Sequence, residues 1–360
     1  MNKKPLLILL IVLIFLSACQ TSEADSAAYP TDTASPSVLP PTLTTTITPI
    51  APTRTQKPPK PISPSATPTR RLILMAVGDV MLGRTIGELI EVQGYESPFI
   101  YTAETLKSAD ITLGNLECPI SERGEAEEKI YAFRAPETAG EALKYAGFDI
   151  VSLANNHILD YGPHALEDTL NNLASNDIHP VGAGMDHTSA YQAVLVDING
   201  LRLAFLAFAD IAPGNYDYLS WEAAVDKAGI AWAHPQRIRE GVQAAKERAD
   251  LVIVLFHNGY EFVETVSRFQ QESAKLAIDS GASLVIGSHP HVLQRIEPYN
   301  DGLIVYSMGN FVFDNFLFPP NYSAILKVEL SQKGIESYEL IDVVVQLNGV
   351  PQIMPYKRDK

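Results

Sequence analysis

The sequence of 360 residues is 46% hydrophobic and 19% charged, which supports a folded core and excludes a chain that is disordered throughout. Residues 72–360 hold 39 acidic and 20 basic residues. This excess of acidic residues argues against a nucleic-acid partner, because binding to nucleic acid depends on Lys and Arg side chains that contact the phosphates. A small anionic substrate stays compatible with this charge, since a bound metal ion would reverse the local field.

The N-terminus has the parts of a secretory signal peptide in their usual order: two lysines, an apolar run over residues 6–16, and small residues before Cys19. The stretch LSAC that ends at Cys19 resembles the bacterial lipobox. Residues 1–18 are therefore predicted to be a lipoprotein signal peptide, and Cys19 is predicted to be lipidated. The simpler alternative is a cysteine that happens to follow a signal peptide. The lipobox interpretation predicts a protein anchored by lipid to the extracytoplasmic face of the cell membrane.

Residues 19–71 are expected to be the lipidated cysteine followed by a disordered stalk. The segment 20–71 contains 11 prolines, 12 threonines and no glycine. Such a composition cannot bury enough apolar surface to offset the entropy of ordering. The stalk would lift the domain of residues 72–360 away from a membrane.

From residue 72 onward, short apolar runs alternate with longer amphipathic stretches. The apolar runs predict buried strands at 72–77, 111–115, 149–154, 178–183, 202–209, 251–256, 283–288 and 303–308. The amphipathic stretches predict helices at 103–109, 136–147, 163–176, 234–249 and 268–281. This alternation predicts an α/β domain with helices covering sheet faces, and residues 322–349 add antiparallel strands.

Five of the predicted strands end in potential metal ligands. These are Asp79; Asn115 and Glu117; Asn155, Asn156 and His157; His257; and the pair His289 and His291. Taken singly, an aspartate after a glycine is usually a turn residue, and a lone histidine after a strand is usually a loop residue. Gathered at the carboxyl edge of a sheet, where ligands bind in open α/β folds, they predict a metal site. A mixed set of oxygen and nitrogen ligands suits Mn, Fe or Zn.

The motifs at these strand ends resemble those of a known family. GDVMLGR, GNLECPI, ANNHILDYG, HNGYE, GSHPHV and YSMGNFVFD are similar, in this order, to the motifs of the bacterial capsule-synthesis CapA (PGA-cap) family, part of the calcineurin-like metallophosphatase superfamily. The resemblance covers residues 72–318. It implies a calcineurin-like metallophosphatase αββα sandwich, in which two mixed β-sheets are flanked by helices and two divalent metal ions lie at the strand ends.

The resemblance implies one shared metal ligand and five separate ones. Glu117 would bridge the two ions, Asp79 and His291 would bind the first, and Asn156, His257 and His289 would bind the second. The remaining histidines, His164, His179, His187 and His234, are expected to be structural or solvated.

His157 is implied to be the catalytic acid that protonates the leaving group. Asp160 is expected either to orient the imidazole or to form a turn. Met81 stands where the superfamily has a histidine, so the first ion would be either under-ligated or completed by water or by Asn115.

Three further residues are candidates for substrate contact. They are Arg84, Glu261 and Asn310. The alternative for the first two is a surface ion pair, and the alternative for Asn310 is a turn-forming core residue.

Two metal ions at such a site would lower the pKa of a bridging water and favour attack on a phosphoester or on an amide. The family's association with poly-γ-glutamate capsules makes a γ-glutamyl amide the second substrate class. The implied function is therefore a metal-dependent hydrolase in capsule synthesis, export or processing, with the capsule machinery and an anionic polymer as partners. The alternative is a non-catalytic, metal-stabilised protein that binds or anchors an anionic polymer.

Overall fold

The computed structural model describes residues 70–212, 216–314 and 319–355, all within a compact unit that runs from Ser65 to Lys360. The predicted signal peptide, Cys19 and the predicted stalk up to residue 69 lie outside the described residues. In the part of the chain that the structure describes, no helix is both long and apolar enough to cross a bilayer.

The first sheet is mixed and has eight strands. They are β1 (Arg71–Val80), β2 (Ile111–Leu116), β3 (Ile150–Ser152), β4 (His179–Val181), β13 (Asn310–Val312), β14 (Tyr322–Ser331), β15 (Gly334–Val345) and β16 (Pro351–Ile353). Their order is β16-β15-β14-β1-β2-β3-β4, and β13 pairs with the end of β1. β1 to β4 run parallel, whereas β14, β15 and β16 are antiparallel, as the alternation in the tail predicts.

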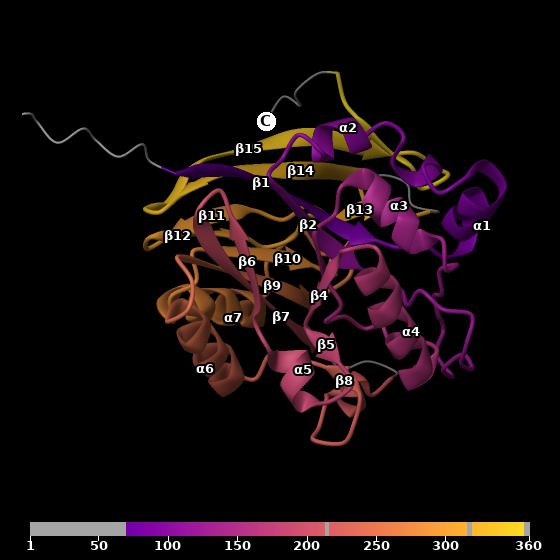
Figure 1. Ribbon diagram of the computed structural model, residues 1–360, viewed down its shortest axis with the longest axis horizontal. Coiled ribbons are helices and arrows are strands. Elements are labelled where there is room, and N and C mark those ends of the chain that lie inside the picture. Colours follow the sequence, from indigo (N-terminus) through magenta and orange to yellow (C-terminus); the bar gives the residue numbers. More distant parts are fainter. Residues whose placement is uncertain (1–69, 213–215, 315–318, 356–360) are drawn as a thin grey trace, which may run out of the picture. The chain divides into compact units, whose positions relative to one another are not determined.

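The second sheet is also mixed and has six strands. They are β6 (Val194–Ile198), β7 (Leu201–Ile211), β9 (Leu251–Gly259), β10 (Leu284–Ser288), β11 (Ile296–Tyr299) and β12 (Gly302–Val305). Four central strands are parallel, and the edge strands β6 and β11 are antiparallel to their neighbours. Figure 1 shows this sheet below the first one, with the short ladder of β5 (Ala183–Gly184) and β8 (Gly229–Ile230) to one side.

Side-chain alternation along β7 explains why the second sheet is covered on both faces. Successive strand residues point to opposite faces. Leu203 and Phe205 join the large core that includes the first sheet, whereas Ala204 and Leu206 join a second core. Helices α6 (Pro235–Lys246) and α7 (Arg268–Asp279) pack over that second core (Figure 1).

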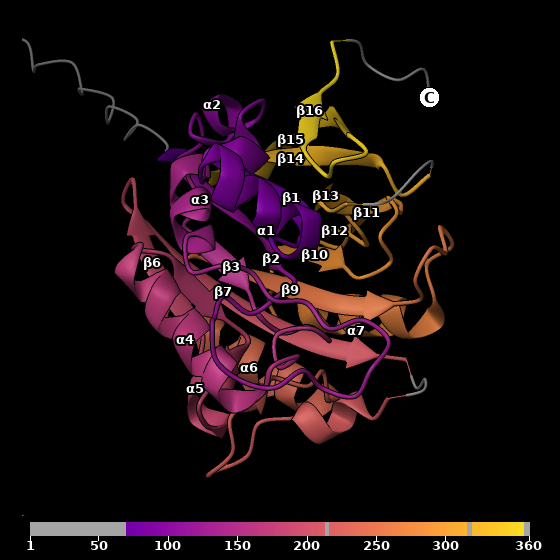
Figure 2. The ribbon, with the colours of Figure 1, turned by 90° about the vertical axis from the view of Figure 1, so that its right-hand side faces the viewer.

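Four of the remaining helices pack on the side of the first sheet. They are α1 (Arg84–Gln93), α2 (Ala103–Leu106), α3 (Ala139–Ala146) and α4 (Gly162–Ser175), and Figure 2 shows α1 and α3 beside β1 and β2. The short helix α5 (His187–Tyr191) packs against β5 and β8, and its Tyr191 contacts Phe208 of the second core. Ile86 of α1 and Leu143 of α3 are fully buried in the large core. Helices, sheet, sheet and helices in this order confirm the expected αββα sandwich.

Candidate metal centre

The two sheets bring their polar strand ends together. β1, β2 and β3 of the first sheet and β9 and β10 of the second supply the side chains, either from the last strand residues or from the turns that follow. All six predicted ligands meet there, and each is at most 5% exposed: Asp79, Glu117, Asn156, His257, His289 and His291. Parallel strands that end at one edge account for this convergence of residues far apart in sequence.

Two buried triads within this cluster could each hold a metal ion. One is formed by Glu117, His257 and His289, and the other by Asp79, Glu117 and His291. In each triad the potential ligand atoms lie within 4.8 Å of one another. Glu117 belongs to both, so the arrangement has the form of a dinuclear site with one shared carboxylate.

The spacing of the ligand atoms around His257 is close to that around a single ion. Its Nε2 lies 2.8 Å from Oδ1 of Asn156, 3.1 Å from Nδ1 of His289 and 3.8 Å from Oε1 of Glu117. Ligands bound at about 2.1 Å in tetrahedral or octahedral geometry lie roughly 3.0–3.4 Å apart. The Nδ1 atom of His257 lies 2.9 Å from Oγ of Ser288, which fixes the ring with Nε2 toward the cluster.

The second triad is held in a similar way. Nδ1 of His291 lies 3.3 Å from Oδ2 of Asp79, and Nε2 lies 3.8 Å from Oε1 of Glu117. Oδ1 of Asn310 lies 2.8 Å from Nδ1 of His291, and Asn310 is fully buried. A hydrogen bond at Nδ1 leaves Nε2 to face the cluster.

Two positions that depart from the superfamily pattern have local partners. Met81 is fully buried, and its Sδ accepts a hydrogen bond from the backbone of Gly83. Asn115 donates from Nδ2 to Oδ1 of Asp79 over 2.9 Å. Asn115 therefore braces the carboxylate of Asp79 in the structure.

The shared carboxylate carries the strongest sign that a cation belongs here. Neither oxygen of Glu117 has a hydrogen-bond partner among the described residues, although both are buried. Burial, reinforced by the charge of Asp79, raises the pKa of Glu117 well above its usual value. Burial also lowers the pKa of His257 far below its usual value and that of His289 to about 3. A buried carboxylate without donors, beside the neutral imidazoles of His257 and His289, fits divalent metal ions.

The turn after β10 is strained where it presents its two histidines. His289 has φ 96° and His291 has φ 57°, both in the left-handed region that disfavours residues other than glycine. Strain of this kind costs on the order of 1–3 kcal/mol per residue and collects at functional sites. The strained turn around Pro290 sends the two imidazoles to different triads.

His157 lies beside the cluster with its ring fixed on two sides. Nδ1 lies 2.7 Å from Oδ2 of Asp160, and the ring stacks on Phe133 with 4.1 Å between centroids. Nε2 lies 4.0 Å from Oε1 of Glu117. Burial lowers the pKa of His157 to about 4, although Asp160 works in the opposite direction.

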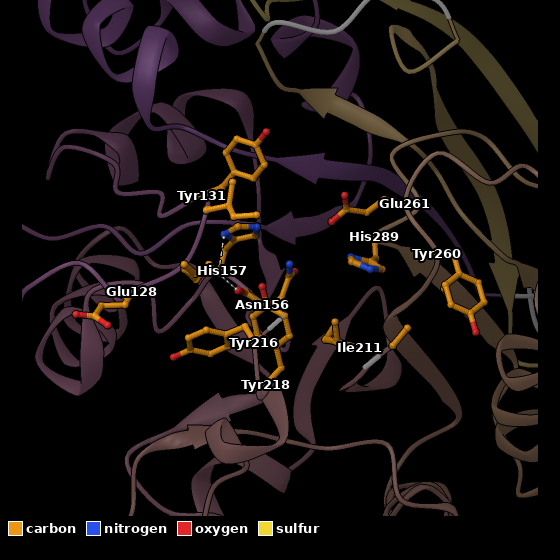
Figure 3. A pocket seen from close by; sticks show the side chains of 14 residues that line it. Glu128, Tyr131, Asn156, His157, Ile211, Tyr216, Tyr218, Tyr260, Glu261 and His289 are labelled. Atoms are coloured by element: carbon orange, nitrogen blue, oxygen red, sulfur yellow. Dashed lines mark hydrogen bonds between the residues drawn. The ribbon is translucent and has the colours of Figure 1, made fainter. Parts of the chain in front are cut away.

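The three candidates for substrate contact lie in different surroundings. Glu261 lines the pocket above the cluster (Figure 3). Arg84 forms an ion pair with Asp314, and its guanidinium carbon lies 4.6 Å from the centroid of Phe133. Asn310 is the buried partner of a histidine, as described above, so it lies behind the cluster.

The other histidines lie apart from both triads. His164, His179 and His234 are exposed, and His187 stacks on Tyr191.

Lys129 is a residue of the site that the sequence did not single out. Its Nζ lies 2.6 Å from Oδ1 of Asp160 and donates a hydrogen bond of 2.6 Å to the backbone oxygen of Asn156.

Asn155 braces the loop instead of pointing to the cluster. Its Oδ1 accepts hydrogen bonds from the backbone N–H groups of His157 and Ile158, and both donor–acceptor distances are 3.0 Å. Its Nδ2 donates to Oδ1 of Asn115 over 3.1 Å, which joins the ends of β3 and β2. Asn155 therefore fixes the backbone that carries Asn156 and His157.

Comparison with known proteins identifies the family. The model of the family described as bacterial capsule synthesis protein PGA_cap matches residues 73–315. The chain belongs to the PGA_cap family. Among its relatives, the capsule biosynthesis protein CapA of Bacillus anthracis is 32% identical over 81% of this chain and 71% of its own length. The PGA biosynthesis protein CapA of Bacillus subtilis (strain 168) is 32% identical over 79% of this chain and 73% of its own.

A solved structure supports the fold of this PGA_cap member. A hypothetical protein from Thermus thermophilus aligns with a TM-score of 0.50 over 75% of this chain and 98% of its own length, at 14% identity. That similarity concerns the architecture of the domain.

Proposed function

We propose that this PGA_cap protein is a lipid-anchored, cell-surface hydrolase that depends on two divalent transition metal ions and acts in the synthesis, export or processing of capsule polymer such as poly-γ-glutamate. Its relatives carry the names capsule biosynthesis and PGA biosynthesis protein CapA. The observation that carries the hydrolase proposal is the carboxylate of Glu117, which two buried triads share and which has no hydrogen-bond partner among the described residues.

Different residues of the chain have different roles in this proposal. Asp79, Glu117, Asn156, His257, His289 and His291 would hold the ions. When bound, two such ions would activate water and neutralise charge on a phosphoester or γ-glutamyl amide substrate. The orientation of the ring by Asp160 leaves Nε2 of His157 on the side of the cluster.

His157 then serves as the acid for the leaving group. Burial lowers its pKa to about 4, and bound cations would lower it further, whereas the negative charge of a bound phosphoester would favour the protonated imidazole. Lys129 and Asp160 form a buried ion pair that keeps the ring in place.

Hydrolysis assays with metal-loaded and chelated protein test this proposal. The panel contains phosphomonoesters, phosphodiesters and γ-glutamyl peptides, and only metal-loaded protein should turn one of them over. His157→Ala should keep its metal content and lose on the order of 10²–10⁴ in kcat, as expected when a general acid is removed. Parental turnover by this variant would rule out the acid role. Failure of the loaded parent to hydrolyse any substrate would support the non-catalytic, polymer-binding alternative.

A further inference from the structure

The pocket over the candidate metal centre is lined by aromatic rings. It has a volume of about 770 Å³, and His157, Asn156 and His289 lie at its base. Its walls include four tyrosines, which Figure 3 shows around the histidines: Tyr131, Tyr216, Tyr218 and Tyr260. A volume of this size suits a small organic ligand, and amphipathic rings supply both flat contact surface and hydroxyl groups.

The charge of the same pocket is unfavourable for a polyanion. Glu128 and Glu261 line it, and Lys129 is the one lysine or arginine among the lining residues that the structure describes. The ammonium group of Lys129 is already paired with Asp160, and its side chain is only 4% exposed. Beyond the pocket, 39 acidic and 20 basic residues in the range 72–360 repel a polycarboxylate at longer distance.

We infer that this pocket takes a phosphoester of an uncharged, hydroxyl-rich sugar ring and not a polyglutamate chain, an inference that rests on the proposed dinuclear centre. The metal ions would neutralise the phosphate, which is the one anionic group of such a ligand. Tyr131 and Tyr260 are 62% and 50% exposed. The ring of Tyr260 packs edge-on against Phe269, with 5.4 Å between centroids, and that of Tyr131 lies 6.5 Å from Phe133, so the exposed part of each ring could cover an apolar face of a sugar. Carboxylates only accept hydrogen bonds, so Glu128 and Glu261 suit hydroxyl donors and disfavour further carboxylates.

Calorimetric titration of the metal-loaded full chain tests the inference. The probes are N-acetylglucosamine 1-phosphate, glycerol 1-phosphate, adenosine 5′-monophosphate and a γ-glutamyl pentapeptide. The sugar phosphate should bind at least about tenfold more tightly than each of the others. Tyr131→Ala and Tyr260→Ala should each lower the affinity ratio of sugar phosphate to glycerol phosphate by on the order of three- to tenfold.

Conservative and remote variants separate stacking from general damage. Tyr131→Phe keeps the ring and should keep most of the ratio. Tyr338→Ala, at a tyrosine of β15 that is 43% exposed, should leave the ratio unchanged. Three results would each overturn the inference. They are equal affinity for sugar and glycerol phosphates, tighter binding of the nucleotide or of the γ-glutamyl peptide, and an unchanged affinity ratio in both alanine variants.

Turnover measured on the same samples tells this inference apart from the proposed function. Tyrosine-dependent binding of the sugar phosphate without hydrolysis supports the inference and contradicts the hydrolase. Hydrolysis of glycerol phosphate as fast as of the sugar ester supports the hydrolase and contradicts the inference.

Discussion

Replacing Glu117 by glutamine should make the metal-free protein more stable while it weakens metal binding. Both carboxylate oxygens are buried without a hydrogen-bond partner among the described residues, and burial together with Asp79 raises the pKa of the group. A buried polar group left unsatisfied costs about 1–3 kcal/mol, and more when it is charged. Glu117→Gln keeps a buried polar amide but removes the cost of holding a proton on the carboxyl group, which is about 1.4 kcal/mol for each pH unit above the usual glutamate pKa. Chelated protein should therefore gain on the order of 1–3 kcal/mol in the free energy of unfolding near neutral pH.

The dependence on pH has a definite sign. Because the folded pKa of Glu117 is raised, the metal-free folded state binds more protons than the unfolded state, and its stability falls as pH rises above the usual glutamate pKa. The advantage of the glutamine variant should therefore grow over the same range.

Urea denaturation of chelated and metal-loaded samples measures both effects. The parent should be stabilised by added metal much more than the variant, since the variant lacks the shared ligand. A glutamine variant that is less stable than the parent after chelation would refute the reasoning, because the carboxylate would then be a stabilising group in the metal-free fold.

Three further predictions concern other parts of the chain. Lys129→Met should lower the free energy of unfolding, measured by urea denaturation, by about 3–5 kcal/mol, because it leaves the fully buried Asp160 without its ion-pair partner. Adding Asp160→Asn to this variant should recover part of the loss. Cys118 is fully buried, and burial raises its pKa to about 12. Its thiol should therefore resist alkylation at neutral pH until the protein is unfolded. Rapid alkylation of the folded protein, detected by mass spectrometry, would contradict this. Cys19→Ala should shift the protein from the membrane to the soluble fraction or block its maturation, and unchanged membrane fractionation would exclude the lipid anchor.

The central strands were predictable from sequence because their apolar runs are buried on both faces, whereas the edge strands β6 and β11 are only partly buried and were not predicted. The run 251–256 lies wholly within β9, which continues to Gly259. The run 303–308 was predicted as one strand, but β12 ends at Val305 and β13 begins at Asn310 in the other sheet. Residues 306–308 lie between the two strands, followed by Gly309 with φ 65°, and an apolar run does not show where a buried strand ends.

Helix α1 was not predicted, and its sequence explains why. No side-chain hydrogen bond caps its N-terminus at Gly83, and Gly87 lies within the helix. Its buried face consists of Ile86, Gly87 and Ile90. Packing in the large core stabilises it, which local sequence does not reveal.

The candidate ligands were predictable because each lies at or just after the end of a strand, whereas their supports were not. Lys129 lies between elements, in a stretch without helix or strand periodicity, and it meets Asp160 only through the fold. Asn310 was assigned to substrate contact from its motif, yet the fold places it behind His291. The register of β13 beside β1 creates that contact, and no local pattern specifies it.

Elemental analysis of the purified protein tests the dinuclear centre most directly. After reconstitution with Mn, Fe or Zn and removal of free ions, the parent should hold close to two ions per chain. A variant with both His289→Ala and His291→Ala should lose most of this metal, because one histidine belongs to each buried triad. Metal at background level in the folded parent, or full metal content in the double variant, would contradict a metal centre built on these residues.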